Sequence, residues 1–283
     1  MKRILIIILV ISFNFNLFSQ DDLFKLLDEK RDYKITSTFK TIKIVNGQSV
    51  EIVDHGDLLF LVQHRFGTLN SGAYNLFGLD NSQVRFGLDY GLNNWCSFGL
   101  GRSSFLKTID GNAKVRLFNQ KKGGKNFPLS LVWYSSVFLK QVLPGDNTVK
   151  YVSDQLSYVH QILLSHKFNN SISLQLSPSW VHKNIVAINE DHDLYSLGVG
   201  FRYKLIQRIS INSEYFYQLN KYSNINSLSL GCDIETGGHV FQLHITNSPA
   251  MFERAFIHEN NDSFLDGDIY FGFNISRVFT IKR

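Results

Sequence analysis

Residues 171–180 read SISLQLSPSW, and the side chains in this stretch alternate between two kinds. One set of alternate positions holds four serines and a glutamine, and the other set holds Ile172, Leu174, Leu176, Pro178 and Trp180. A period of two residues is typical of a β-strand, whose successive side chains point to opposite faces. In a soluble sandwich the apolar face would cover a core. In a membrane barrel it would face lipid, and the serines would line the inside.

The same alternation repeats from Asp57 onward. Long connections, near 67–83, 138–154, 181–193 and 247–266, tend to alternate with short turns, as external loops and periplasmic turns do in outer-membrane barrels. The sequence therefore predicts an all-β fold, a single antiparallel up-and-down transmembrane β-barrel of about 12 strands over residues 57–283. The predicted strands lie near 57–66, 84–91, 95–102, 111–119, 128–137, 155–166, 171–180, 194–203, 209–217, 227–234, 238–246 and 267–277.

The composition agrees with a barrel. Charged residues make up 19% of the chain and aromatic residues 14%, while the mean hydropathy is only −0.08. The apolar residues are therefore spread out and not gathered into the runs of about 20 that helical membrane spans need. The formal net charge is +5, but there is no run of Lys and Arg, so nucleic acid is not an expected partner.

The N-terminal stretch MKRILIIILVISFNFNLFSQ has a basic start, an apolar middle and a small residue, Ser19, near its end. This order predicts a secretory signal peptide over residues 1–19, cleaved near Ser19, with an uncleaved anchor as the alternative. We interpret residues 20–56 as a periplasmic N-terminal leader. It contains a short amphipathic helix over 21–32 and a turn at Asn46-Gly47, and part of it is able to enter the barrel.

Eight pieces of the chain together resemble a known family. In order they are LLDEKRD, TFKTIKIVNGQSVE, LLFLVQHRFG, NLFGLD, GLDYGLNNW, GLGRSS, GGHVFQLHITNS and GDIYFGFNISRVF, spread from Leu26 to Phe279. Their order and spacing resemble the outer-membrane β-barrels of Gram-negative bacteria grouped as domain of unknown function 5777. The resemblance implies a barrel in the outer membrane, with membrane lipid as a partner, and it implies no activity.

The C-terminus departs from many barrels, which end on an aromatic residue that the barrel-assembly machinery reads during insertion. Here Phe279 is followed by Thr280, Ile281, Lys282 and Arg283. We expect the assembly machinery to be a partner, which either reads the slightly inset Phe279 or inserts this chain less efficiently.

The polar faces of the predicted strands carry charges of both signs. Two interpretations stay open: a network of ion pairs that closes the bore, because an unpaired buried charge is costly, or a slightly cationic constriction that selects small anions or acidic solutes. The candidate lumen residues are Arg65, Arg85, Asp89, Lys114, Arg116, Arg202, Glu214, Asp233 and His244.

The predicted external loop 247–266 is more apolar than a solvated loop needs. Met251, Phe252, Arg254 and Phe256 are its candidate functional residues. Such a patch either folds back over the barrel mouth or binds a partner or ligand.

No catalytic or metal-binding residue is predicted, and no cofactor. Histidines on a strand share a face at spacing i, i+2, which does not occur here, and there is no GxSxG motif. We therefore predict a non-enzymatic channel that passes small solutes through a polar lumen, with Arg and Lys setting a weak anion preference. The alternative is a closed structural or interaction barrel that acts through its external loops or leader. An outer-membrane surface hydrolase is third.

Overall fold

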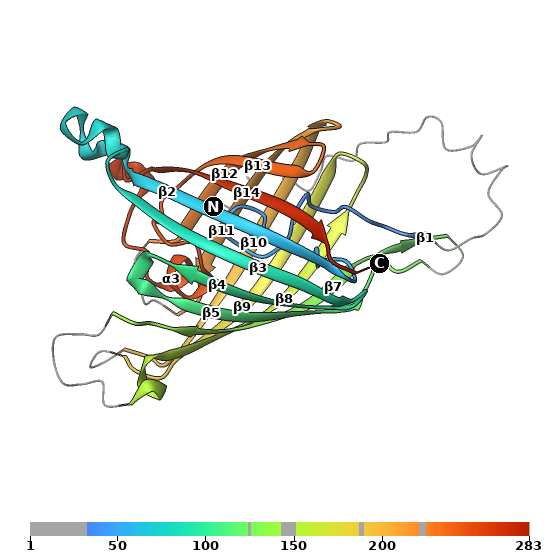
Figure 1. The fold of residues 1–283 in the computed structure, drawn as a ribbon, viewed down its shortest axis with the longest axis horizontal. Helices are drawn as coiled ribbons and strands as arrows, with labels where there is room; N and C mark the ends of the chain where they lie inside the picture. Colours follow the sequence, from blue (N-terminus) through green and yellow to red (C-terminus); the bar gives the residue numbers. More distant parts are fainter. Residues whose placement is uncertain (1–32, 124–125, 143–150, 187–189, 221–224, 283) are drawn as a thin grey trace, which may run out of the picture.

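The computed structural model describes residues 33–123, 126–142, 151–186, 190–220 and 225–282. Twelve strands form one closed antiparallel barrel (Figure 1), which confirms the predicted fold and strand number. The predicted strand ends lie within three residues of the observed ones. The barrel strands are β2 (Asp57–Thr68), β3 (Ser82–Asn93), β4 (Cys96–Ser103), β5 (Ile109–Phe118), β7 (Ser130–Leu139), β8 (Leu156–Lys167), β9 (Ile172–Lys183), β10 (Asp193–Ile206), β11 (Ile209–Gln218), β12 (Ser227–Thr236), β13 (His239–Thr246) and β14 (Tyr270–Thr280).

The strands follow the chain order around the barrel, and the ring closes where β14 pairs with β2. Two short strands, β1 (Tyr33–Lys34) and β6 (Lys121–Lys122), pair with each other at one end of the barrel (Figure 1). The described helices are α3 (Glu253–His258), η1 (Leu69–Ser71), η2 (Ala73–Gly78), η3 (Phe105–Lys107), η4 (Val152–Gln155) and η5 (Phe264–Asp266). Within the described part of the chain, none of the helices has the length and apolar character needed to cross a membrane.

The two faces of the barrel wall separate as the alternation predicts. On β9 the serines at 173, 177 and 179 are buried, whereas Leu176 and Trp180 are 39% and 40% exposed on the outer face. A continuous apolar belt of this kind is typical of a surface that faces lipid.

The two ends of the barrel differ in their connections. At the end here named the turn end, β8–β9, β10–β11 and β12–β13 are joined by short turns. The opposite end, the loop end, carries the long connections between β2 and β3, β7 and β8, and β13 and β14. The connection 119–129 at the turn end is longer and contains β6, and residues 104–108 make a short connection at the loop end.

Residues 38–53, here named the plug, lie inside the barrel, where Figure 1 shows them as a blue trace. They form a hairpin around the predicted turn at Asn46-Gly47. The amide of Ile44 donates to the carbonyl oxygen of Gly47 at 2.8 Å, and that of Ser49 donates to Ile42 at 2.9 Å. The predicted signal peptide and the predicted helix over 21–32 lie outside the described residues.

The root of the plug is fixed at the barrel seam. The carbonyl oxygen of Gly56 accepts hydrogen bonds from the amides of Ile281 and Lys282, at 2.9 and 3.0 Å. Gly56 has φ = +78°, and a Cβ there would lie 2.0 Å from the carbonyl oxygen of Lys282. Only glycine therefore fits this position, where the chain turns from the lumen into β2.

Candidate functional site

The candidate site is the filled interior of the barrel. Eight of the nine predicted lumen residues are buried there, with exposed fractions of 0 to 6%: Arg65, Arg85, Asp89, Lys114, Arg202, Glu214, Asp233 and His244. The ninth, Arg116, lies at the turn end of β5, half-buried beside a cavity. The structure thus brings the eight together around the plug and places Arg116 at its edge.

Lys114 holds the plug by its main chain. Its ammonium donates to the carbonyl oxygens of Ile42, Ser49 and Glu51, at 2.8, 2.9 and 3.0 Å. An ammonium has three N–H donors, so all the donors of Lys114 bind the plug. The contact joins both arms of the plug hairpin to β5.

Glu214 on β11 binds the tip of the same hairpin as an acceptor of hydrogen bonds, whereas Lys114 is a donor. Its carboxylate accepts the main-chain amides of Asn46 at 2.7 Å, Gly47 at 2.9 Å and Val45 at 3.2 Å. Charge-assisted hydrogen bonds of this kind are stronger than neutral ones. Lys114 and Glu214, which the sequence predicted as charges of the lumen wall, therefore bind the backbone of the plug.

Uncharged amides complete the grip, and the sequence reasoning missed them. Gln175 accepts the amide of Val50 at 2.9 Å and donates to the carbonyl of Gln48 at 2.7 Å. Gln242 donates to the carbonyl of Ile44 at 2.6 Å, and Asn274 donates to that of Val45 at 3.0 Å. Arg202 donates to Ser37 and Thr38 carbonyls, and Arg65 donates to the side-chain oxygen of Asn46.

One pair of wall charges is satisfied without the plug. Arg85 forms a bidentate pair with Asp110, at 3.0 Å from Nε and 2.5 Å from Nη2, and also donates to Gln63 at 3.0 Å. Asp110 was not among the predicted residues, although it lies on the same face of β5 as Lys114. A Cβ at Gly101 would lie 2.2 Å from Nη2 of Arg85, so the glycine on β4 makes room for the pair.

The wall is not uniformly polar, which departs from the predicted polar lumen. Val132 and Tyr134 of β7 and Leu163 of β8 point inward and are at most 1% exposed. They pack with apolar residues of the plug, namely Phe39, Ile44, Val50 and Ile52. Where the plug lies, the inner face is a protein core rather than a water-filled bore, and this explains the apolar inward positions.

The loop end is filled by the segment that follows β13. The predicted external residues Met251, Phe252 and Phe256 are each 0% exposed, and Arg254 is 5% exposed. Phe252 and Phe256 pack against inward apolar residues of β7 to β11, namely Phe138, Val159, Val181, Leu194 and Phe216. In this arrangement the patch folds into the barrel mouth and is covered there.

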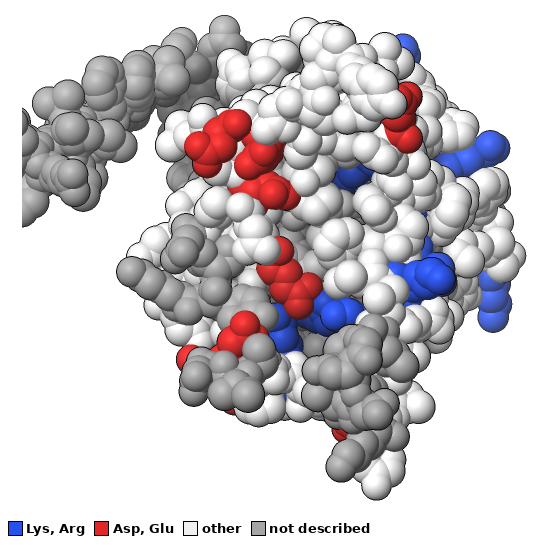
Figure 2. Space-filling model, turned by 90° about the vertical axis from the view of Figure 1, so that its left-hand side faces the viewer, with Lys and Arg blue, Asp and Glu red and all other residues white. Residues whose placement is uncertain are grey.

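Charged residues surround this filled mouth. Glu259 accepts from Arg254 at 2.7 Å and lies 3.1 Å from the ammonium of Lys183. Figure 2 looks onto the loop end, and there acidic and basic side chains lie close together across the mouth. Burial raises the pKa of Glu259, but Arg254 and Lys183 outweigh it and hold the pKa below its ordinary value.

Glu253 joins the two segments that fill the barrel. Its carboxylate accepts from Lys43 at 2.7 Å and Gln48 at 2.9 Å, both in the plug, and from the hydroxyl of Tyr134 at 3.0 Å. Burial raises the pKa of this carboxyl group, whereas the Lys43 ammonium lowers it, and the net shift is downward. Glu253 is therefore ionised, and its contacts connect the plug to α3 directly.

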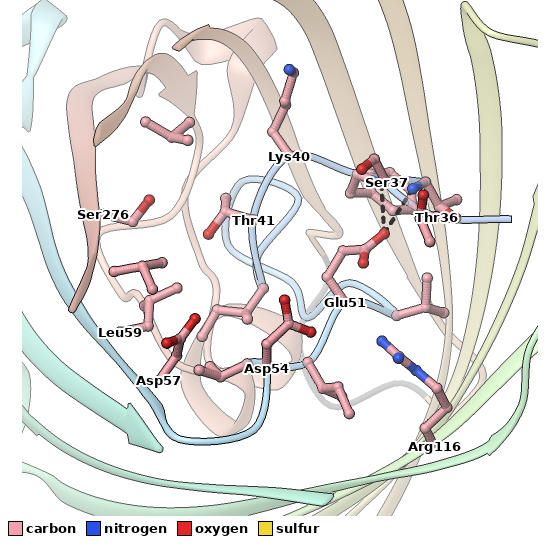
Figure 3. Close-up of a pocket in the computed structure, with 18 of the residues that line it drawn as sticks. Thr36, Ser37, Lys40, Thr41, Glu51, Asp54, Asp57, Leu59, Arg116 and Ser276 are labelled. Carbon is pink, nitrogen blue, oxygen red and sulfur yellow. Dashed lines mark hydrogen bonds between the residues drawn. The ribbon is translucent and has the colours of Figure 1, made fainter. Parts of the chain in front are cut away.

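A cavity of about 340 Å³ lies at the turn end, between the plug and the wall. Figure 3 shows Glu51 inside it, where the carboxylate accepts the amides of Thr38 at 2.7 Å and Phe39 at 3.1 Å. Arg116 reaches toward the cavity from β5, and Asp54 and Asp57 lie on another side. Among the described residues, the guanidinium of Arg116 has no hydrogen-bond or ion-pair partner.

The described residues hold no cluster of three or more His, Cys, Asp and Glu side chains that would suit a metal ion. Lys114 and Glu214 are engaged with the plug main chain and Arg85 with Asp110, whereas Asp233 accepts from the side chains of Ser210 and Gln242. The chemistry of this site is thus the binding of a polypeptide segment inside a barrel.

A closed barrel of twelve antiparallel strands with an apolar outer belt defines a class of membrane proteins, the porin-like β-barrels. The family model described as a membrane bound beta barrel domain (DUF5777) matches residues 39–279. The chain belongs to this family, as its sequence pieces indicated. The match begins within the plug, so the family pattern includes the segment inside the barrel.

Solved structures share the fold. The NanC porin aligns with a TM-score of 0.50 and 8% identity, covering 80% of this chain and all of that one. An outer-membrane channel from Pseudomonas putida F1 aligns with a TM-score of 0.50 and 12% identity, covering 81% and 98%. No curated protein matches this sequence.

Proposed function

We propose that this protein is an outer-membrane channel for small solutes that its own plug and α3 hold closed, and that it conducts when the plug leaves the lumen. The observation that carries this proposal is the grip of wall side chains on the plug main chain. Lys114 alone contacts three carbonyl oxygens, and Glu214 contacts three amides. Such contacts do not depend on the plug's own side chains, and water can replace them when the segment withdraws.

The topology supports a removable plug. The plug precedes β2 and contributes no strand to the barrel, whose ring closes between β14 and β2. Its withdrawal would break no hydrogen bond between barrel strands. The described part of the leader also enters at the turn end, where β1 lies.

A permanently closed barrel is the second candidate, and the apolar inward residues favour it. Withdrawal of the plug would expose Val132 and Leu163 to water, at a cost of roughly 25 cal/mol for each Å² of apolar surface. In that case the protein would act through its leader or its external loops, as a structural or interaction barrel.

A reversible tether distinguishes the two candidates. A Cβ at Gly231 would lie 3.0 Å from Cγ2 of Val45, so Val45→Cys with Gly231→Cys is placed for a disulfide between the plug and β12. Cys96 and Cys232 are replaced by serine in this chain. We expect brief single-channel openings in planar bilayers under reducing conditions and none after oxidation. A folded chain that stays silent when reduced would favour the closed barrel.

The open channel is proposed to prefer small anions weakly, because Arg116 faces the turn-end cavity without a partner among the described residues. In recordings of open events, Arg116→Glu is expected to lower the anion-to-cation permeability ratio by about threefold. The reversal potential in a salt gradient measures this ratio. The control is Lys121→Glu on β6, outside the barrel ring, and an unchanged ratio in Arg116→Glu would remove this residue from the permeation path.

The remaining assignments are proposals of the same kind. Residues 1–19 would be a cleaved signal peptide and 20–56 a leader, with the turn end in the periplasm and the loop end outside. The barrel-assembly machinery and outer-membrane lipid would be the partners during and after insertion. No residue is proposed to be catalytic, and no cofactor is proposed.

A further inference from the structure

A notch of about 290 Å³ opens on the outer face of the wall, where β7, β8, β9 and β10 run side by side. It lies in the apolar belt, outside the filled interior described above. Its lining is mostly aromatic and apolar: Trp133, His160, Ile162, Pro178, Trp180, Tyr195 and Leu219, with Gln161, Ser179 and Ser196 as the polar members.

Pro178 creates the notch. The antiparallel register of β8 and β9 pairs Gln161 with Ser179 and resumes with Leu164 and Leu176, so two residue pairs at the proline are skipped. The register is the same on both sides of the gap, which means that the strands separate locally without a bulge. A proline has no amide hydrogen to donate and is unusual inside a sheet.

Aromatic rings form one wall of the notch. The His160 ring stacks between two indoles, with its centroid 6.2 Å from that of Trp133 and 5.2 Å from that of Trp180. Trp133 is 38% exposed and Trp180 is 40% exposed. These rings and Pro178 line the same notch, so a ligand in it would contact mostly apolar surface.

Three polar residues line the notch, Gln161, Ser179 and Ser196, and their side chains belong to the inward phase of their strands. The amide of Gln161 donates to the hydroxyl of Ser179 at 2.7 Å on that side. What the notch presents to the bilayer is therefore its aromatic and apolar lining.

We propose that this notch binds one acyl chain of a membrane lipid or free fatty acid, entering sideways from the bilayer. The apolar walls and the opening within the lipid-facing belt select a chain over a soluble ligand. The site is distinct from the lumen and does not rest on the proposed channel activity.

The protein has three tryptophans, which makes the test direct. Two single-tryptophan chains are folded into phosphatidylcholine vesicles: Trp95→Phe with Trp133→Phe, which keeps Trp180 in the notch, and Trp133→Phe with Trp180→Phe, which keeps Trp95 after β3. Each is titrated with 9,10-dibromostearate, a fatty acid that quenches indole fluorescence on contact. Heat-modifiable mobility on gels confirms that each chain has folded.

We expect Trp180 quenching to saturate, at a dibromostearate mole fraction about tenfold lower than half-quenching of Trp95, and unbrominated stearate to reverse it. Equal, non-saturating curves for both reporters would overturn the proposal, because contact with bulk lipid would then explain the quenching.

Two variants test the location. Pro178→Leu in the Trp180 reporter chain fills the notch, and Ile162→Phe in the same chain fills it from β8 while leaving the proline. Both should abolish the saturable phase of Trp180 quenching. Leu230→Phe adds similar bulk to the outer face of β12 and should leave it unchanged. Saturable quenching that survives in both filled variants would contradict binding in the notch.

Discussion

A chain that begins at Asp54, and so lacks the plug, is expected to conduct for most of a planar-bilayer recording, whereas the full chain is expected to open only briefly. The barrel ladder is intact in this chain because β2 begins at Asp57 and pairs with β14 and β3 as before. Gly56 is retained, so the seam to Ile281 and Lys282 is also preserved. What the truncation removes is the polypeptide that occupies the interior.

Loss of the plug should also release α3. Without Lys43 and Gln48, the buried carboxylate of Glu253 would keep only the hydroxyl of Tyr134 as a partner. Leaving a buried charge without its counter-ion costs about 3–5 kcal/mol, and an outward movement of the segment into water avoids this cost. We therefore expect one truncation to open both ends of the barrel.

The measurement is single-channel conductance, with heat-modifiable gel mobility as the control for folding. A second chain, in which residues 249–259 are also replaced by a Gly-Ser linker, removes the seal at the loop end directly. If both chains fold and neither conducts, the channel proposal fails and the closed barrel is the better interpretation.

The second large effect is expected from loosening the grip on an intact plug. Lys114→Met with Glu214→Gln removes the two charged clamps, which together make six hydrogen bonds to plug main chain. Hydrogen bonds to charged groups contribute about 1.5–3 kcal/mol. A net loss of about 3 kcal/mol would raise the ratio of open to closed time about 100-fold.

The matched control is Lys204→Met, the same chemical change at the turn end of β10, where the side chain makes no hydrogen bond to the plug within the described residues. It should leave the open probability at the wild-type level. Limited proteolysis from the turn side gives an independent readout, since a plug that leaves more often is cut faster. An unchanged open probability and cleavage rate in the double variant would show that these clamps do not hold the closed state.

The sequence predicts the barrel well because strand alternation is a local property. Each predicted strand can be recognised from about ten residues, and the direction of Lys114 or Glu214 follows from counting by twos. Strand alternation does not show what fills the interior of the barrel, toward which these side chains point. Val132 and Leu163 point inward because the plug covers them, and only contacts between distant parts of the chain reveal this.

The site was harder to predict than the fold for the same reason. The turn at Asn46-Gly47 can be predicted from the sequence. Its position inside the barrel depends on Glu214, which lies 168 residues after Asn46. Gln175, Gln242 and Asn274 are ordinary polar residues on an inward face until a main chain lies beside them. Glu253 lies in a connection with no periodicity, so no pattern marks it.

The shared carboxylate of Glu253 has a thermodynamic consequence for the two sides of the membrane. Lys43 arrives on the segment that enters at the turn end, and Glu253 on the segment that enters at the loop end. If the plug stabilises α3 in the barrel by a given free energy, α3 stabilises the plug by the same free energy, because such coupling is reciprocal. Binding outside that draws α3 away makes a pull on the leader easier by the same amount, and tension on the leader weakens the hold on α3. The two segments are therefore expected to be coupled through this contact, whether or not a solute passes.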